Sequence, residues 1–213
     1  MRTLIAIPCM DTVYTSFMSS LLHLEPVGDV SYKIVSGTLI YDARNQLVQH
    51  ALQSDCDQVL WLDSDMIFPP DLLKILTDDL VGGREMVSGL YFTRRQPIRP
   101  CVFQECSVID VGNGQKMPLT ANFYAYPQDQ IFEIAACGFG AVLMSRKLLE
   151  DVTDKFGKMP FSPALGFGED LSFCMRASKA GHNIYCDSRV KLGHIARMPI
   201  EEKDYLLCQS KRC

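Results

Sequence analysis

Two aspartates that follow an apolar segment are the residues of this sequence whose spacing most clearly suggests chemistry. Asp63 and Asp65 come directly after Gln58–Leu62 (QVLWL) and are separated by Ser64. In an extended chain, residues two apart point the same way, so both carboxylates are expected to converge. Close carboxylates repel unless a cation lies between them, and hard oxygen ligands suit Mg²⁺ or Mn²⁺. The pair predicts a metal site or, alternatively, a loop that caps a helix starting near Asp71.

A second acidic pair, Glu169 and Asp170, opens a predicted helix over Glu169–Ala180 after a Gly-Phe-Gly segment. The helix dipole keeps an acid at a helix N-terminus ionised, so it can serve as a general base near an acceptor hydroxyl. Ordinary N-capping is the alternative interpretation of the same residues.

A histidine and a glycine motif complete the set of candidate site residues. His194 stands near the end of a short apolar segment, where an imidazole can bind a metal or be purely structural. Gly138-Phe139-Gly140 lies between two apolar segments, where small residues allow the backbone to approach a ligand or to form a bulge.

Strands and helices are expected to alternate over residues 1–92, and these elements would position the first of the motifs. This alternation favours an α/β fold with a largely parallel sheet, in which ligands bind beyond the carboxyl ends of the strands. The expected strands are Thr3–Pro8, Tyr32–Gly37, Gln58–Leu62 and Met86–Phe92, and the expected helices are Val13–Leu24, Asp42–Ser54 and Leu72–Val81.

The sequence after residue 92 has a different pattern, with more strands and fewer helices. The expected strands are Cys101–Val111, Ile131–Ala136, Ala141–Met144, Asn183–Cys186 and Val190–His194, and the expected helices are Arg146–Thr153, Glu169–Ala180 and Ile200–Leu207. No repeat or linker divides the chain, and a segment rich in Pro and Gly at 159–168 is the best candidate for a mobile loop.

The composition is that of a folded globular chain. The 213 residues are 47% hydrophobic and 22% charged, which excludes disordered, collagen-like and coiled-coil chains. A net charge of −4 gives no basic surplus for general nucleic-acid binding. No segment is long and apolar enough for a transmembrane helix, and no signal peptide is recognised, so we expect a cytoplasmic protein. Nine cysteines without a C-x-x-C pair give weak support for a zinc site or a disulfide framework.

The charges are unevenly distributed along the sequence. Eight acids but only two bases lie between Asp55 and Glu85, and Arg94, Arg95 and Arg99 follow soon after. An acidic site beside a basic loop suits a metal ion and a phosphorylated ligand, although solvated surface charge is the commoner origin of such a pattern.

The four motifs, in this order, resemble those of glycosyltransferase family 2 and the wider GT-A nucleotide-sugar transferases. The resemblance runs over nearly the whole chain, from Ile5 to His194. It implies a GT-A (Rossmann-like), three-layer α/β fold with a mixed, mostly parallel central sheet and a smaller second sheet. It also implies one domain over 1–213, with a nucleotide-binding half (1–92), a donor-sugar and acceptor half (93–199), and a C-terminal helix and tail (200–213).

The resemblance implies a role for each motif. Asp63-Ser64-Asp65 is similar to the D-x-D motif, in which Asp65 is the direct metal ligand and Asp63 lies nearer the ribose or a metal-bound water. His194 resembles the C-terminal metal-binding histidine. Asp170, with Glu169 in an x-E-D motif, would be the catalytic base of an inverting reaction. The implied nucleotide and donor contacts are Pro8, Asp11, Arg44, Asp63, Ser64, Gly138, Phe139 and Gly140, and the implied loop for donor or acceptor contains Arg94 and Arg95.

The predicted function is transfer of a sugar from a nucleotide-diphosphate sugar, a UDP-sugar by default, to an acceptor hydroxyl with Mn²⁺ or Mg²⁺. Little chain follows His194, so acceptor contacts are expected from loops, the tail or a partner subunit of an oligomer. One alternative is a haloacid-dehalogenase-like phosphatase, because LWLDSD also resembles its hhhDxD strand, with Asp63 as nucleophile. Another is a non-catalytic nucleotide-sugar or glycan-binding module. The sequence leaves the sugar, the base and the acceptor open.

Overall fold

The structure is a computed structural model that describes residues 1–196, 202 and 206. Its strands are β1 (Arg2–Pro8), β2 (Asp29–Val35), β3 (Gln58–Leu62), β4 (Met66–Ile67), β5 (Met86–Leu90), β6 (Val102–Asp110), β7 (Lys116–Asn122), β8 (Ile131–Ile134), β9 (Ala136–Cys137), β10 (Ala141–Ser145), β11 (Ile184–Lys191) and β12 (Gly193–His194). Its helices are α1 (Thr15–His23), α2 (Ile40–Gln53), α3 (Leu72–Val81), α4 (Arg146–Phe156) and α5 (Glu169–Ala180). The helix predicted over Ile200–Leu207 lies outside the described residues, apart from Glu202 and Leu206.

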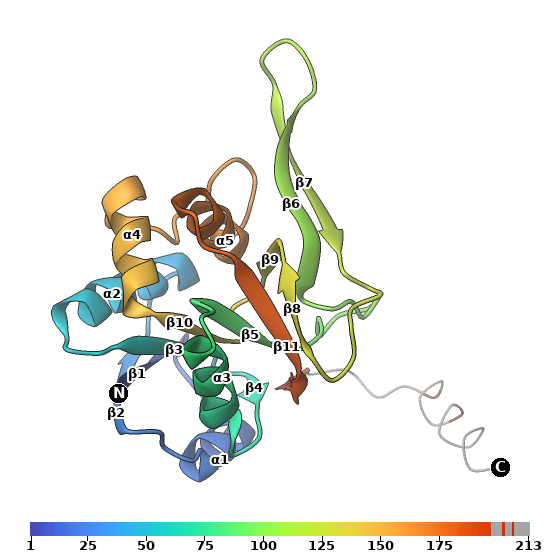
Figure 1. Cartoon of the computed structure of the whole chain (residues 1–213). Coiled ribbons are helices and arrows are strands. Elements are labelled where there is room, and N and C mark those ends of the chain that lie inside the picture. Colours follow the sequence, from blue (N-terminus) through green and yellow to red (C-terminus); the bar gives the residue numbers. More distant parts are fainter. Residues whose placement is uncertain (197–201, 203–205, 207–213) are drawn as a thin grey trace.

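A seven-stranded mixed sheet in the order β2-β1-β3-β10-β5-β11-β8 forms the centre of the fold (Figure 1). β1 is parallel to β2 and β3, and β5 is parallel to β11, whereas β10 and β8 run antiparallel to their neighbours. The sheet confirms the predicted mixed, mostly parallel arrangement. The antiparallel β10 lies between β3 and β5, so the chain returns to the carboxyl ends of these two strands where β10 begins.

Helices cover both faces of this sheet and give the fold three layers. Apolar side chains of α2, α4 and α5 share one buried cluster with one face, and those of α1 and α3 share another cluster with the opposite face. This explains why β1, β3 and β5 are almost continuously apolar, since strands covered on both faces have no polar side.

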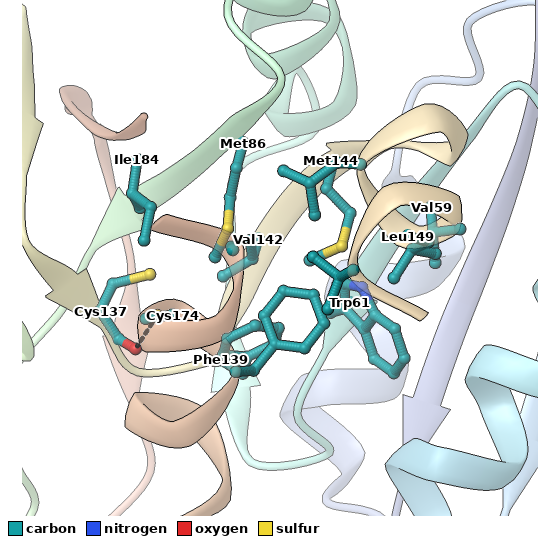
Figure 2. Packing of buried hydrophobic residues seen from close by; sticks show 14 of the residues in the cluster. Val59, Trp61, Met86, Cys137, Phe139, Val142, Met144, Leu149, Cys174 and Ile184 are labelled. Atoms are coloured by element: carbon teal, nitrogen blue, oxygen red, sulfur yellow. Dashed lines mark hydrogen bonds between the residues drawn. The ribbon is translucent and has the colours of Figure 1, made fainter. Parts of the chain in front are cut away.

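Aromatic packing beneath the carboxyl end of β3 joins the two halves of the chain. Figure 2 shows Trp61 of β3 beside Phe139 of the glycine motif, and their ring centroids lie 6.0 Å apart at an interplanar angle of 72°. Phe161 and Phe173 complete this group, with centroids 4.9 and 5.4 Å from that of Phe139. Edge-on contacts of this kind stabilise a core beyond the area that they bury, so the floor of the site has fixed geometry.

A three-stranded sheet, β7-β6-β9, forms the predicted smaller second sheet. Its β6–β7 hairpin extends away from the body of the molecule (Figure 1). The hairpin turns at 112–114, where Gly112 and Gly114 adopt positive φ. β7 was not predicted from the sequence, because its segment (KMPLTAN) contains Pro118, a residue rare inside strands, and it is mostly exposed.

The strand prediction near the C-terminal end is wrong in one respect. A single strand, β11, spans residues that were expected to separate two short strands. Asp187 and Ser188 are polar but fully buried within it. Asp187 accepts hydrogen bonds from Arg189, and Ser188 bonds to the backbone of Gln130. These partners allow a polar segment to remain inside the sheet.

In the part of the chain that the structure describes, no helix has the length and apolarity needed to cross a membrane.

Candidate functional site

The acidic and glycine motifs meet at the carboxyl end of β3. β10 pairs with β3 so that Ala141 lies opposite Leu62, and the backbone N–H of Asp63 donates to the carbonyl of Gly140 at 3.1 Å. β1 runs parallel to β3, and its Ala6 pairs with Trp61. Pro8 comes two residues after Ala6 and therefore lies at the same edge of the sheet. The sheet itself therefore places three of the predicted site segments together.

Asp63 and Asp65 do not have the extended geometry that the sequence analysis assumed. The segment forms a turn, in which the N–H of Met66 donates to the carbonyl of Asp63 at 3.2 Å. The turn allows the chain to reverse into β4 immediately after β3. The two carboxylates consequently face different partners, and Ser64 between them is half-buried.

His194 reaches Asp65 through a two-residue ribbon that the sequence did not predict. β12 pairs antiparallel with β4, with His194 opposite Met66, and the N–H of Ile195 donates to the carbonyl of Asp65 at 2.9 Å. His194 Nε2 thereby lies 3.5 Å from Asp65 Oδ2, and its Nδ1 lies 2.8 Å from the carbonyl oxygen of Phe92. Two residues far apart in the sequence therefore face each other at the predicted metal site.

Asp65 pairs with a cation that is far more exposed than the one that pairs with Asp63. Its Oδ2 pairs with His194 and also with the guanidinium of Arg94, whose side chain is 49% exposed. Burial raises the pKa of Asp65, but the hydrogen bond with His194 and the charge of Arg94 outweigh it, so the net pKa is lowered. Burial opposes the charged form of His194, but Asp65 favours it, and the pKa of the imidazole is raised overall. Asp65 is therefore an ionised carboxylate.

Asp63 is held from beneath by Arg44 of α2. The guanidinium is only 3% exposed; its Nη2 donates to Asp63 Oδ1 at 2.8 Å and its Nη1 to Glu169 Oε1 at 3.1 Å. It also lies over the rings of Phe139 and Phe161, with centroid distances of 5.1 and 5.7 Å. Sequence reasoning placed Arg44 against the nucleotide, whereas the structure places its guanidinium below the acids, where it links α2, the end of β3 and the start of α5.

Asp170 lies beside the glycine motif at the N-terminus of α5. Its Oδ1 accepts a hydrogen bond from the N–H of Leu171 at 2.8 Å, and a Cβ added to Gly138 would lie 3.6 Å from its Oδ2. Burial raises the pKa of Asp170, while Arg44 lowers it and the neighbouring Glu169 raises it, so the net pKa is raised. Asp170 is thus a buried carboxyl group with a stronger affinity for protons than an ordinary aspartate.

Tyr91, which the sequence analysis did not single out, explains why the motif needs glycines. The N–H of Gly140 donates to Tyr91 Oη at 3.2 Å, and a Cβ on Gly138 would lie 2.0 Å from the same oxygen. Its ring also packs edge-on against His194, with centroids 5.4 Å apart. No sequence signal distinguished this tyrosine from an ordinary strand residue, because its role depends on partners distant in the sequence.

The donor groups of Asp65 and His194 fit a divalent cation that receives further ligands from a substrate. Carboxylate oxygen and imidazole nitrogen are both ligands of Mn²⁺ in proteins. The Phe92 carbonyl at His194 Nδ1 resembles the outer partner that orients most metal-bound histidines. Among the described residues, however, no group of three or more His, Cys, Asp or Glu is gathered closely enough to hold a metal. Protein ligands alone would therefore not complete the coordination shell.

Two of the remaining predicted residues lie in exposed loops. Asp11, in the loop after β1, is exposed, and Arg95 is exposed in the loop between β5 and β6.

All seven described cysteines are free and buried or half-buried, as expected of small apolar side chains.

No protein-family model and no curated protein matches this chain. Solved structures do match it. The structure of A197 from STIV has a TM-score of 0.66 and 23% identity, and the match covers 92% of this chain and 87% of that chain. The structure of GalNAc-T7 with UDP, GalNAc and Mn²⁺ has a TM-score of 0.60 and 10% identity, and the match covers 92% of this chain and 43% of that chain. At these identities the likeness shows the fold alone, and that fold is α/β and GT-A-like.

Proposed function

We propose that this chain is a glycosyltransferase that transfers a sugar from a nucleotide-diphosphate sugar to an acceptor hydroxyl. The observation that carries the proposal is the meeting of Asp65 and His194 at the edge of the sheet that also holds Asp170 and the glycine motif. The GT-A-like fold supports it, as does the match to GalNAc-T7, a protein whose structure contains UDP, GalNAc and Mn²⁺.

Asp170 is the proposed catalytic base of an inverting reaction. Its carboxylate would accept the proton of the acceptor hydroxyl as that oxygen attacks the anomeric carbon and the bond to the diphosphate breaks. Burial and the neighbouring Glu169 raise its pKa, which improves it as a base near neutral pH. Gly138 lies beside Asp170, and the backbone of Gly138 and Gly140 forms the proposed wall for the donor sugar.

Asp65 and His194 would hold a divalent cation, Mn²⁺ or Mg²⁺. When bound, such an ion supplies charge neutralisation for the leaving diphosphate. Asp63 is proposed as a neighbouring anchor at this site and not as a direct ligand, because Arg44 binds its Oδ1. Pro8, Asp11 and Ser64 remain proposed contacts to the nucleotide.

The phosphatase alternative requires Asp63 to act as a nucleophile. The buried Arg44 holds one of its oxygens at 2.8 Å, and the fold is GT-A-like. Both observations favour the transferase. A non-catalytic nucleotide-sugar-binding module would share the donor site, and only a test of transfer separates it from an enzyme.

Calorimetric titration of UDP and GDP, each with and without Mn²⁺, tests the proposed donor site. We expect one nucleotide to bind at least tenfold more tightly with Mn²⁺, and the effect to disappear in His194→Ala. Lys116→Gln, at the tip of the β6–β7 hairpin, is the matched control and should bind as the unmodified protein does. Absence of nucleotide binding, or binding indifferent to the metal, would contradict the proposal.

A further inference from the structure

A basic hollow lies beside His194, on the loop that joins β5 to β6. The cavity has a volume of about 440 Å³. Its lining comprises Tyr91, Thr93, Arg94, Arg95, Gln96, Pro97, Arg99, Cys101 and His194. None of these described residues is acidic, so the hollow is positively charged in a protein whose net charge is −4. A local positive patch on an acidic protein differs from the overall basic charge that attracts polyanions in general.

Arg95 and Arg99 differ from Arg94 in that they have no carboxylate partner among the described residues. Arg94 pairs with Asp65, but within the described part of the chain no ion pair involves the guanidinium of Arg95 or of Arg99. Both residues are exposed. A ligand at these two guanidinium groups would therefore break no ion pair between described residues.

The loop that carries these arginines is internally ordered. The N–H of Thr93 donates to the carbonyl of Arg99 at 2.8 Å, and Thr93 Oγ1 accepts from the N–H of Arg99 at 3.0 Å. The same hydroxyl lies 3.3 Å from the carbonyl of Arg95. One threonine thus ties together the backbone positions from which both arginines project, which reduces the entropy cost of holding a ligand.

The inner wall of the hollow borders the proposed reaction centre. The N–H of Gly138 donates to the carbonyl of Cys101 at 2.9 Å, and a Cβ on Gly138 would lie 3.6 Å from Asp170 Oδ2. His194 forms another part of the wall. A ligand in the hollow would therefore contact His194 and lie next to the backbone that adjoins Asp170.

We propose that Arg95 and Arg99 form a binding site for a phosphate group of a substrate. The inference rests on the proposed function and specifies part of its substrate chemistry. Two planar guanidinium groups match the oxygens of a phosphate, and charge-assisted bonds of this kind are the stronger hydrogen bonds in proteins. The phosphate belongs either to the diphosphate of the donor or to a phosphorylated acceptor, and both sources present the same chemistry to the arginines.

Titration of inorganic phosphate into the full chain tests the site without any nucleotide. We expect the double variant Arg95→Gln/Arg99→Gln to bind phosphate at least about tenfold more weakly than the unmodified protein. Arg84→Gln/Lys116→Gln removes the same charge away from the hollow and should bind normally. Arg95→Lys/Arg99→Lys should retain part of the affinity. Equal phosphate binding by the glutamine variant and the unmodified protein, or no binding by either, would overturn the proposal.

The same titration in the presence of saturating UDP and Mn²⁺ distinguishes the two sources. Phosphate that still binds the UDP-saturated protein, with UDP affinity unchanged in the glutamine variant, identifies an acceptor phosphate. Phosphate that UDP displaces, with UDP but not uridine binding weakened in that variant, identifies the donor diphosphate. Phosphate binding that depends on the arginines in a protein that binds no nucleotide would contradict the proposed function while leaving this site intact.

Discussion

The two acids of the Asp-Ser-Asp segment occupy opposite kinds of surroundings, although one residue separates them. Asp63 binds Arg44, a guanidinium that is 3% exposed and shared with Glu169. Asp65 pairs with Arg94, whose side chain is 49% exposed, and with His194 at 3.5 Å. The first pair is enclosed by the aromatic floor of the site, whereas the second faces the hollow at its entrance.

This difference indicates how one short segment can serve both structure and chemistry. A buried guanidinium between two carboxylates cannot leave without uncompensated charges, so Arg44 acts as a positioning residue for Asp63 and for the start of α5. An exposed ion pair is weak and exchangeable. The exposed guanidinium of Arg94 can therefore leave Asp65 for a cation or a substrate at little cost, whereas the buried guanidinium of Arg44 cannot leave Asp63.

Replacement of Arg44 by methionine removes the buried ion pairs with Asp63 and Glu169 and should have the largest effect. Asp63, Glu169 and Asp170 would remain together without their shared cation. We expect a loss of about 3–5 kcal/mol in the free energy of unfolding, measured by urea denaturation. Arg94→Met, the matched exposed variant, should lose about 1 kcal/mol or less. Similar losses in both variants would show that the two ion pairs are equivalent.

Replacement of Asp170 by asparagine separates the proposed base from the proposed donor site. We expect the rate of sugar transfer to fall by about 10²–10⁴-fold, because general-base catalysis contributes that much. UDP affinity in the presence of Mn²⁺ should change little, since Asp170 is not a proposed metal ligand. A variant that retains the full transfer rate would contradict the assignment of the base.

Replacement of Arg94 by glutamine tests the exposed side of the comparison. Arg94 competes with a cation for Asp65 Oδ2, so its loss should raise the affinity for Mn²⁺ alone by about two- to fivefold, as expected for a surface ion pair. Electron paramagnetic resonance of free Mn²⁺ measures this affinity without nucleotide. Arg84→Gln is the control, and a weaker affinity in Arg94→Gln would mean that Arg94 supports the metal site.

The pH dependence of transfer gives the smallest and most specific effect. Asp170 must be ionised to accept a proton, and burial raises its pKa despite the opposing charge of Arg44. Activity should therefore fall as the pH drops through a value above about 3.9, the pKa of an unperturbed aspartate. A profile of kcat/KM against pH measures this limb. A limb at or below the ordinary value would show that burial does not control Asp170.

Local pattern was sufficient to predict the bounds of several strands and helices. The strand Gln58–Leu62 and the helices Leu72–Val81 and Glu169–Ala180 have the bounds that periodicity and punctuation by Gly and Pro predicted. These features depend on neighbouring residues, and hydrophobic periodicity reports such local preferences directly.

The partners of the site residues were decided by tertiary structure. Sequence indicated that Arg44, Asp65 and His194 were functional candidates, but not that Arg44 would lie buried beneath Asp63 or that a β4–β12 ribbon would carry His194 to Asp65. Tyr91 gave no signal at all. Contacts between distant segments depend on how the strands are ordered and on which side chains fill the space between layers. Residue types therefore determined which groups could do chemistry, and packing determined which of them meet.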